Sequence, residues 1–112
     1  MVESAHASLW HWGYAGGALE RQRGEWLISH VYAVVGDGPN ALRYAQRCWA
    51  ITEAEHFVDF DFAYACEGLA RAHAVNGETA TAAEWRARAE EAGRLIADDE
   101  DRDIFEADLA TA

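Results

Sequence analysis

The sequence predicts an all-α fold, and three observations support this prediction. Of the 112 residues, 24 are Ala, the strongest helix former, and only one is Pro. Apolar residues recur at spacings of three and four, which is the period of one helical face. Turn sequences at 36–39 and 76–78 each separate two such apolar stripes. A chain of this length forms one domain, for which we expect about six helices.

The first half of the chain predicts three helices. The first spans 4–17 and contains three glycines, so packing must stabilise it. The second spans about 19–35. Because apolar residues cover more than half of its circumference, we expect it in the middle of the packing. Gly36 then suits the left-handed end of a helix, and Pro39 suits the first turn of a third helix that ends near residue 55.

The second half of the chain predicts three more helices. The stretch 61–96 has the pattern of two antiparallel helices, because its apolar stripe breaks at 76–78 and then resumes. Thr81 with Glu84 fits a capping box at the start of the second of these helices. A last helix spans 98–110, and its acidic first turn interacts favourably with the helix dipole.

Charge and cysteine usage restrict the function classes. The formal net charge of -11 argues against binding to nucleic acid or to an anionic membrane, which both require a basic surface. No stretch approaches the roughly 18 apolar residues of a membrane span. Cys48 and Cys66 lie on apolar stripes, as buried thiols do in a reducing compartment. We therefore expect a cytoplasmic protein.

The two predicted hairpins, 20–55 and 61–96, align with each other at one fixed offset of 41 residues. A repeat of this length is typical of stacked helical hairpins, each of which needs a neighbour to complete its core. The remaining segments, 4–17 and 98–110, are expected to be capping helices. The aligned pairs are Ile28 with Leu69, Ser29 with Ala70, Tyr32 with His73, Gly36 with Gly77, Ala41 with Ala82 and Cys48 with Ala89.

This pattern resembles the tetratricopeptide repeat (TPR). In that family a large apolar residue, a small neighbour, an aromatic three residues on, a turn Gly and a small Ala follow in this order, as in Leu69-Ala70, His73, Gly77 and Ala82. The offset exceeds the typical ~34 residues, and the closing Pro is absent. The resemblance implies a right-handed superhelical stack of antiparallel helix hairpins. Ordinary helical bundling is the alternative.

The resemblance also implies where a partner binds. First helices of successive repeats line a groove for a peptide or a partner helix, so the expected protein is an interaction module without a cofactor. With two repeats, this groove is either open or closed by the first helix or a second subunit. Carried to this chain, the partner-binding positions are Arg23, Trp26, His30, Tyr64, Glu67 and Arg71.

Two other function classes remain open at this stage. One is a self-associating structural module, a homodimer whose exposed aromatics meet; the aromatic run 9–14 would serve this contact or cap the stack. The other is a small ligand-binding protein or enzyme that uses Glu25, His30 and Glu67. No His pair has zinc spacing, and no nucleophile or nucleotide-loop motif is present, so we expect neither a metal nor catalysis.

The acidic stretch 98–108 holds seven carboxylates and one Arg. It lacks the ligand spacing and the central Gly of a calcium loop. We expect a solvated cap that keeps the end of the stack from adding another hairpin. A docking face for a basic partner is the alternative.

Overall fold

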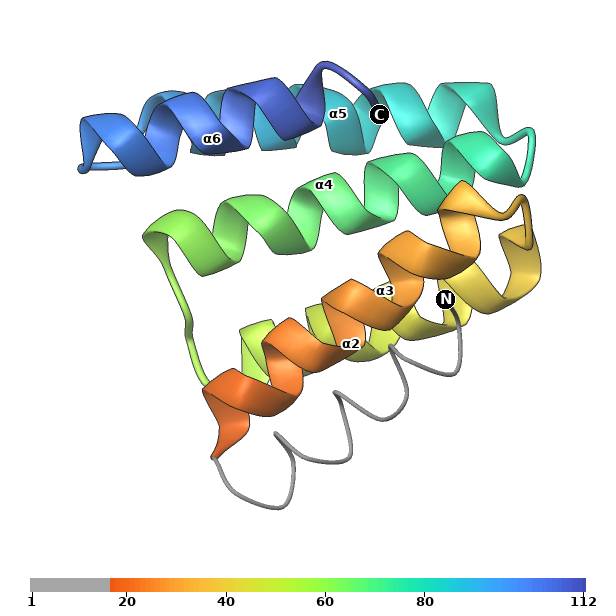
Figure 1. Ribbon diagram of the computed structural model, residues 1–112, viewed down its shortest axis with the longest axis horizontal. Coiled ribbons are helices and arrows are strands. Elements are labelled where there is room, and N and C mark those ends of the chain that lie inside the picture. The colour runs from red at the N-terminus through yellow and green to blue at the C-terminus, as the bar shows by residue number, and fades with distance from the viewer. Residues whose placement is uncertain (1–16) are drawn as a thin grey trace.

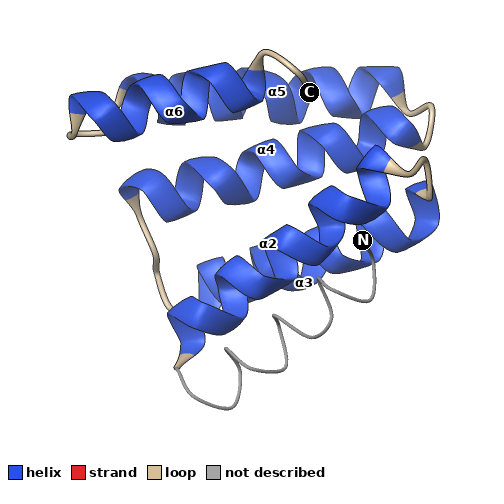
Figure 2. Ribbon diagram, in the orientation of Figure 1, coloured by secondary structure: helices blue, strands red, loops and turns tan. Residues whose placement is uncertain are grey.

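A computed structural model describes residues 17–112, and within this range the chain is all-helical with no strand (Figures 1 and 2). The helix predicted for 4–17 and the aromatic run 9–14 lie outside the described residues, apart from Gly17. The five helices that the structure describes are α2 (Ala18–Val34), α3 (Gly38–Ala54), α4 (Asp59–Val75), α5 (Thr79–Arg94) and α6 (Asp99–Leu109).

The helix boundaries repeat with the offset found in the sequence. Helices α2 and α4 begin at Ala18 and Asp59, which the offset places at equivalent positions of the two hairpins. Helices α3 and α5 begin at Gly38 and Thr79, which are equivalent in the same way. The pairs α2·α3 and α4·α5 therefore form two hairpins of nearly equal length whose helices begin at equivalent positions.

The turns of the two hairpins have the same geometry. Gly36 has φ 85° and Gly77 has φ 77°, a left-handed conformation that a residue without Cβ adopts at low cost. Each Gly N–H bonds to the carbonyl three residues back, and the next N–H bonds to the carbonyl five residues back. This is the Schellman arrangement. The prediction of a left-handed helix end at Gly36 is confirmed, and Gly77 has the same conformation.

Two of the described helices begin with an Asp side chain as N-cap. Asp37 accepts from Asn40 N–H at the start of α3, and Asp98 accepts from Asp101 N–H at the start of α6. The predicted capping box of Thr81 and Glu84 is wrong, because α5 begins at Thr79 with Glu78 as its N-cap residue. The identical turn geometry sets this start.

Helix α4 is the centre of the described part of the fold. It contacts each of the other four helices, and every residue from Ala63 to Ala70 is buried. Small residues such as Ala63, Ala65 and Ala72 let its neighbours approach closely. The sequence predicted the second helix in the middle of the packing. Among the described residues α2 contacts α3 and α4, and Val34 at its end is exposed.

Two apolar clusters fill the core. One surrounds Phe105, Ile96 and Tyr64, and joins α6 to α4 and α5. The other surrounds Leu69 and Ala41, and joins the two hairpins. Between α3 and α5, Trp49 and Trp85 meet edge to face at 5.0 Å. Among the described helices none has both the length and the apolar character required to cross a membrane.

Candidate functional site

A cavity of about 270 Å³ opens between α2 and α4, beside α6. Three of the six predicted partner-binding residues line it, namely Arg23, Trp26 and Tyr64. Side chains four residues apart lie on one helical face, which is why Leu27 follows Arg23 into this wall and Phe60 precedes Tyr64. The complete lining is Gln22, Arg23, Trp26 and Leu27 of α2, Phe60, Asp61 and Tyr64 of α4, and Asp108 of α6.

Aromatic rings form the apolar part of the cavity wall. The Trp26 ring meets the Tyr64 ring edge to face, with centroids 5.1 Å apart. The Phe60 and Tyr64 rings are tilted against each other with centroids 4.7 Å apart, and Phe105 of α6 meets Tyr64 edge to face with centroids 4.9 Å apart. Contacts of this kind fix the orientation of each ring. The wall is therefore already ordered without a partner.

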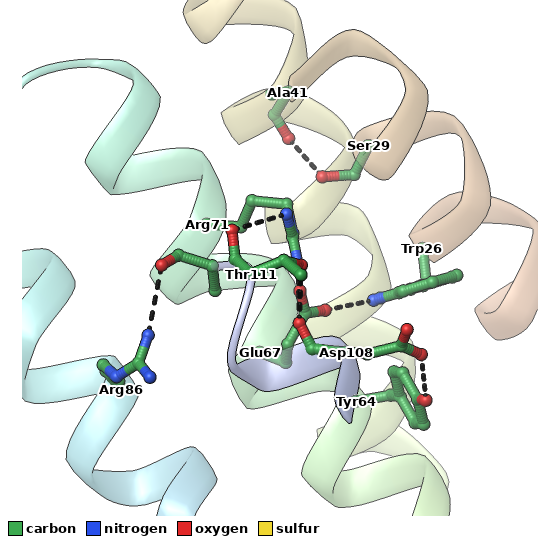
Figure 3. A network of polar contacts seen from close by, with 10 residues as sticks. Trp26, Ser29, Ala41, Tyr64, Glu67, Arg71, Arg86, Asp108 and Thr111 are labelled. Atoms are coloured by element: carbon green, nitrogen blue, oxygen red, sulfur yellow. Dashed lines mark hydrogen bonds and ion pairs between the residues drawn. The ribbon is translucent and has the colours of Figure 1, made fainter. Parts of the chain in front are cut away.

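A buried polar network lies behind this wall (Figure 3). The carboxylate of Glu67 is fully buried at 0% exposure. It accepts from Trp26 Nε1 at 2.8 Å and from Arg71 Nε at 2.7 Å. A buried carboxylate must be paired and hydrogen-bonded, because its loss of water is otherwise too costly. Glu67 therefore fixes the Trp26 indole in place.

Arg71 connects this network to the end of α6 (Figure 3). Its Nη2 donates to the carbonyl oxygen of Asp108 at 3.0 Å and to Thr111 Oγ1 at 2.8 Å. The Tyr64 hydroxyl donates to the Asp108 carboxylate. Burial and the Asp108 carboxylate raise the pKa of Tyr64, so this phenol stays protonated at neutral pH. Helix α6 is thus held against one side of the cavity.

The structure brings the six predicted residues together but gives them different roles. Arg23 is half-exposed and pairs with Asp61 at 2.9 Å. The His30 ring stacks on Trp26 at 5.0 Å, and its buried Nδ1 has no hydrogen-bond partner among the described residues. Glu67 and Arg71 were expected to face a partner. Instead they make contacts within the chain, and the Arg71 side chain is only 12% exposed.

Burial also shifts the titration of His30. Loss of solvent around the imidazole lowers the pKa of His30, and the positive charge of Arg71 lowers it further. The carboxylates of Glu67 and Asp108 oppose this shift. His30 is consequently neutral at physiological pH, and it serves as a packing partner for Trp26.

Glu25 does not join His30 and Glu67 in one site. His30 and Glu67 both contact Trp26, whereas Glu25 faces α3. Glu25 forms an ion pair of 2.8 Å with Arg47 of α3. Gln22 and Ser29, which share its side of the helix, also bond to α3, through Thr52 and the Ala41 carbonyl. Within residues 17–112 no group of three or more His, Cys, Asp or Glu is placed to hold a metal ion.

Sequence reasoning missed five residues of the cavity lining. Phe60 and Leu27 could have been found from the spacing of four residues to Tyr64 and Arg23. Asp108 gave no such signal, because the repeat does not include the segment that carries it. The missed residues are Gln22, Leu27, Phe60, Asp61 and Asp108.

Comparison with known proteins leaves the family open. No model of a protein family, no curated protein and no solved structure matches the chain. Over residues 17–112 the fold is all-helical, with two helical hairpins followed by a further helix.

Proposed function

We propose that the protein is a protein–protein interaction module with a TPR-like superhelical stack of hairpins. It binds a peptide or a partner helix in the groove between α2 and α4. The observation that carries this proposal is the cavity lined by Trp26, Leu27, Phe60 and Tyr64, which lies where the first helices of the two hairpins meet. Grooves between helices bind partners through a few apolar anchors of this kind.

The size of the cavity favours a side-chain anchor over a free ligand. Pockets for drug-sized molecules hold roughly 300 to 1,000 Å³ and enclose most of the ligand. The cavity here holds about 270 Å³. This volume suits one or two side chains of a partner whose remaining surface rests on the surrounding helices.

The ordering of the wall also favours binding. Trp26 is held by Glu67, and Tyr64 is held by Asp108 and by the rings around it. A site that is ordered in advance loses less conformational entropy when the partner arrives. We assign the protein no catalytic role. We place it in the cytoplasm, since Cys48 and Cys66 are both free thiols.

A pair of charge insertions tests the proposal. Leu27→Asp places a carboxylate in the cavity wall, whereas Leu95→Asp places one at an exposed position at the end of α5. Tagged wild-type protein and both variants are expressed at equal levels in the native host, and co-purifying proteins are quantified. We expect Leu27→Asp to lose the partners that Leu95→Asp retains. Equal recovery with both folded variants would contradict the groove assignment.

Light scattering tests self-association in the same samples. If the partner is a second copy of the chain, the wild-type protein is a dimer and Leu27→Asp is a monomer. A wild-type protein that remains monomeric at high micromolar concentration excludes the dimer and leaves a different protein as the partner.

A further inference from the structure

We propose that the cavity between α2 and α4 accepts a cationic side chain, arginine or lysine, from the bound partner segment. This proposal rests on the interaction function proposed above and adds the chemistry of the anchor residue. The relevant features are the charges around the cavity, the apolar wall and the hydrogen-bonding capacity of Asp108.

The charges around the cavity sum to a negative value. Arg23 is paired with Asp61, and Arg71 is paired with Glu67. The remaining carboxylate, that of Asp108, accepts a hydrogen bond from the neutral hydroxyl of Tyr64. A carboxylate accepts more than one donor, so Asp108 can bind a second group. The charges around the cavity are balanced only if this second group is a cation.

The electrostatic field of the rest of the protein is also negative. Helix α6, which supplies Asp108, begins with Asp99, Glu100 and Asp101 in its first turn. The whole chain carries a formal net charge of -11. Charges of one sign around a cleft attract ligands of the opposite sign and raise the rate of association.

The cavity wall suits the hydrocarbon part of such a side chain. Arginine and lysine carry three or four methylene groups below the charged head, and these pack on apolar surface. Leu27, Phe60 and Trp26 provide this surface, with Asp108 at the α6 side. Aromatic rings near a cation add a further attraction.

The alternative anchors fit less well. An acidic side chain would be repelled by Asp108, since the guanidinium that lines the cavity, that of Arg23, already binds Asp61, and that of Arg71 already binds Glu67. A purely apolar side chain would cover the Asp108 carboxylate and remove water from it without supplying a donor, which costs free energy. Only a cation with an apolar stem satisfies both the wall and the carboxylate.

A random peptide library displayed on phage tests the proposal. Peptides are selected on immobilised wild-type protein, and the affinity of the enriched sequences is then measured for four proteins: wild type, Leu27→Asp, Asp108→Asn and Asp103→Asn. Asn at 108 still accepts from Tyr64, so the fold is retained. Asp103 is an exposed residue of the same helix, and its substitution matches the change in net charge.

We expect the enriched peptides to share one Arg or Lys at a fixed position beside an apolar residue. Asp108→Asn should weaken their binding about tenfold, because a hydrogen bond to a charged group is lost, and Asp103→Asn should change it less than twofold. Replacing the shared Arg or Lys with norleucine should give a similar loss with wild-type protein and little further loss with Asp108→Asn.

The possible failures are distinguishable. If no peptide binds, or if Leu27→Asp binds the enriched peptides as well as wild type does, the groove function falls and the cationic anchor falls with it. If Leu27→Asp abolishes binding but the shared residue is acidic or neutral, only the cationic anchor is overturned. Equal losses for Asp108→Asn and Asp103→Asn would indicate general charge attraction and would also overturn it.

Discussion

Trp26 Nε1 donates a 2.8 Å hydrogen bond to Glu67 Oε2, and these two residues occupy the same position in the two hairpins. The neighbouring Gly68 leaves room for the indole, since a Cβ at this position would lie 3.2 Å from Trp26 Cδ1. The repeat has thus placed an aromatic donor in one hairpin and an acidic acceptor in the other. This contact fixes one wall of the candidate binding cavity.

The first prediction concerns the pair of Glu67 with Arg71. Arg71→Met removes the guanidinium and leaves the buried Glu67 carboxylate without its cation. We expect the free energy of unfolding to fall by about 3 to 5 kcal/mol, which is the usual cost of breaking a buried ion pair on one side. Urea denaturation, followed by circular dichroism, measures this change.

Arg86→Met is the matched control for this experiment. Arg86 also forms an ion pair with a glutamate four residues away, Glu90, but both side chains are exposed to solvent by more than a third. Its Nη1 also donates to the Ala112 carbonyl oxygen at 3.1 Å. We expect a loss of about 1 kcal/mol, because an exposed pair contributes little and one hydrogen bond to a carbonyl contributes about 1 kcal/mol. Equal losses for the two variants would contradict the structural role assigned to Arg71.

The second prediction concerns Gly93 at the contact of α5 with α6. Ala favours a helix over Gly by about 1 kcal/mol, so propensity alone predicts that Gly93→Ala is stabilising. However, a Cβ at this position would lie 2.6 Å from Cε2 of the buried Phe105 ring. We expect a net loss of about 1 to 3 kcal/mol in the free energy of unfolding, as is typical of overpacking.

A double-mutant cycle isolates the steric cause. Phe105→Leu removes the ring atoms that the added methyl group would meet. If the clash causes the loss, Gly93→Ala should be neutral or stabilising in the Phe105→Leu background. The same loss in both backgrounds would place its cause elsewhere in α5.

The sequence predicted the hairpins well because their determinants are local. Gly36 and Gly77 mark both turns, and the apolar spacing marks the helices between them. The offset between the repeats also relates the starts of α3 and α5 without any slip in register. The start of α5 was placed too late, at Thr81, because a capping pattern was given more weight than the turn geometry that Glu78 shares with Asp37.

The candidate site was predicted less completely, for a physical reason. The repeat identified Arg23, Trp26 and Tyr64, which do line the cavity. It could not show that Arg71 reaches Thr111 and the Asp108 carbonyl, because this contact depends on how α6 packs against α4. Long-range packing of a segment outside the repeat leaves no periodic signal in the sequence.

The third prediction concerns His30 and pH. Burial and Arg71 lower the pKa of His30 in the folded state below its ordinary value of 6.5. The unfolded chain therefore binds a proton at a higher pH than the folded protein does. Stability contributed by neutral His30 is fully present above pH 6.5 and is lost as the pH falls from there through the lower folded pKa.

Replacing this histidine reveals its share of the pH dependence. His30→Gln removes the titrating group, so its urea midpoint should fall less than that of wild type between pH 7 and pH 5. His56→Gln provides the control, because His56 is exposed in the connection between α3 and α4. If the urea midpoint of His30→Gln falls with pH as much as that of wild type, and that of His56→Gln does not, the pH dependence does not come from His30.

The last prediction concerns the two thiols. Burial raises the pKa of Cys48 to about 12 and that of Cys66 to about 11, and both side chains are fully covered in the core. Because the thiolate is the reactive form, the native protein should react with a chromogenic disulfide reagent at least about a hundredfold more slowly than the urea-unfolded chain does. Single Cys48→Ala and Cys66→Ala variants assign each kinetic phase of the reaction to one thiol. Prompt labelling of one thiol in the native protein would show that its helix opens locally rather than with the whole domain.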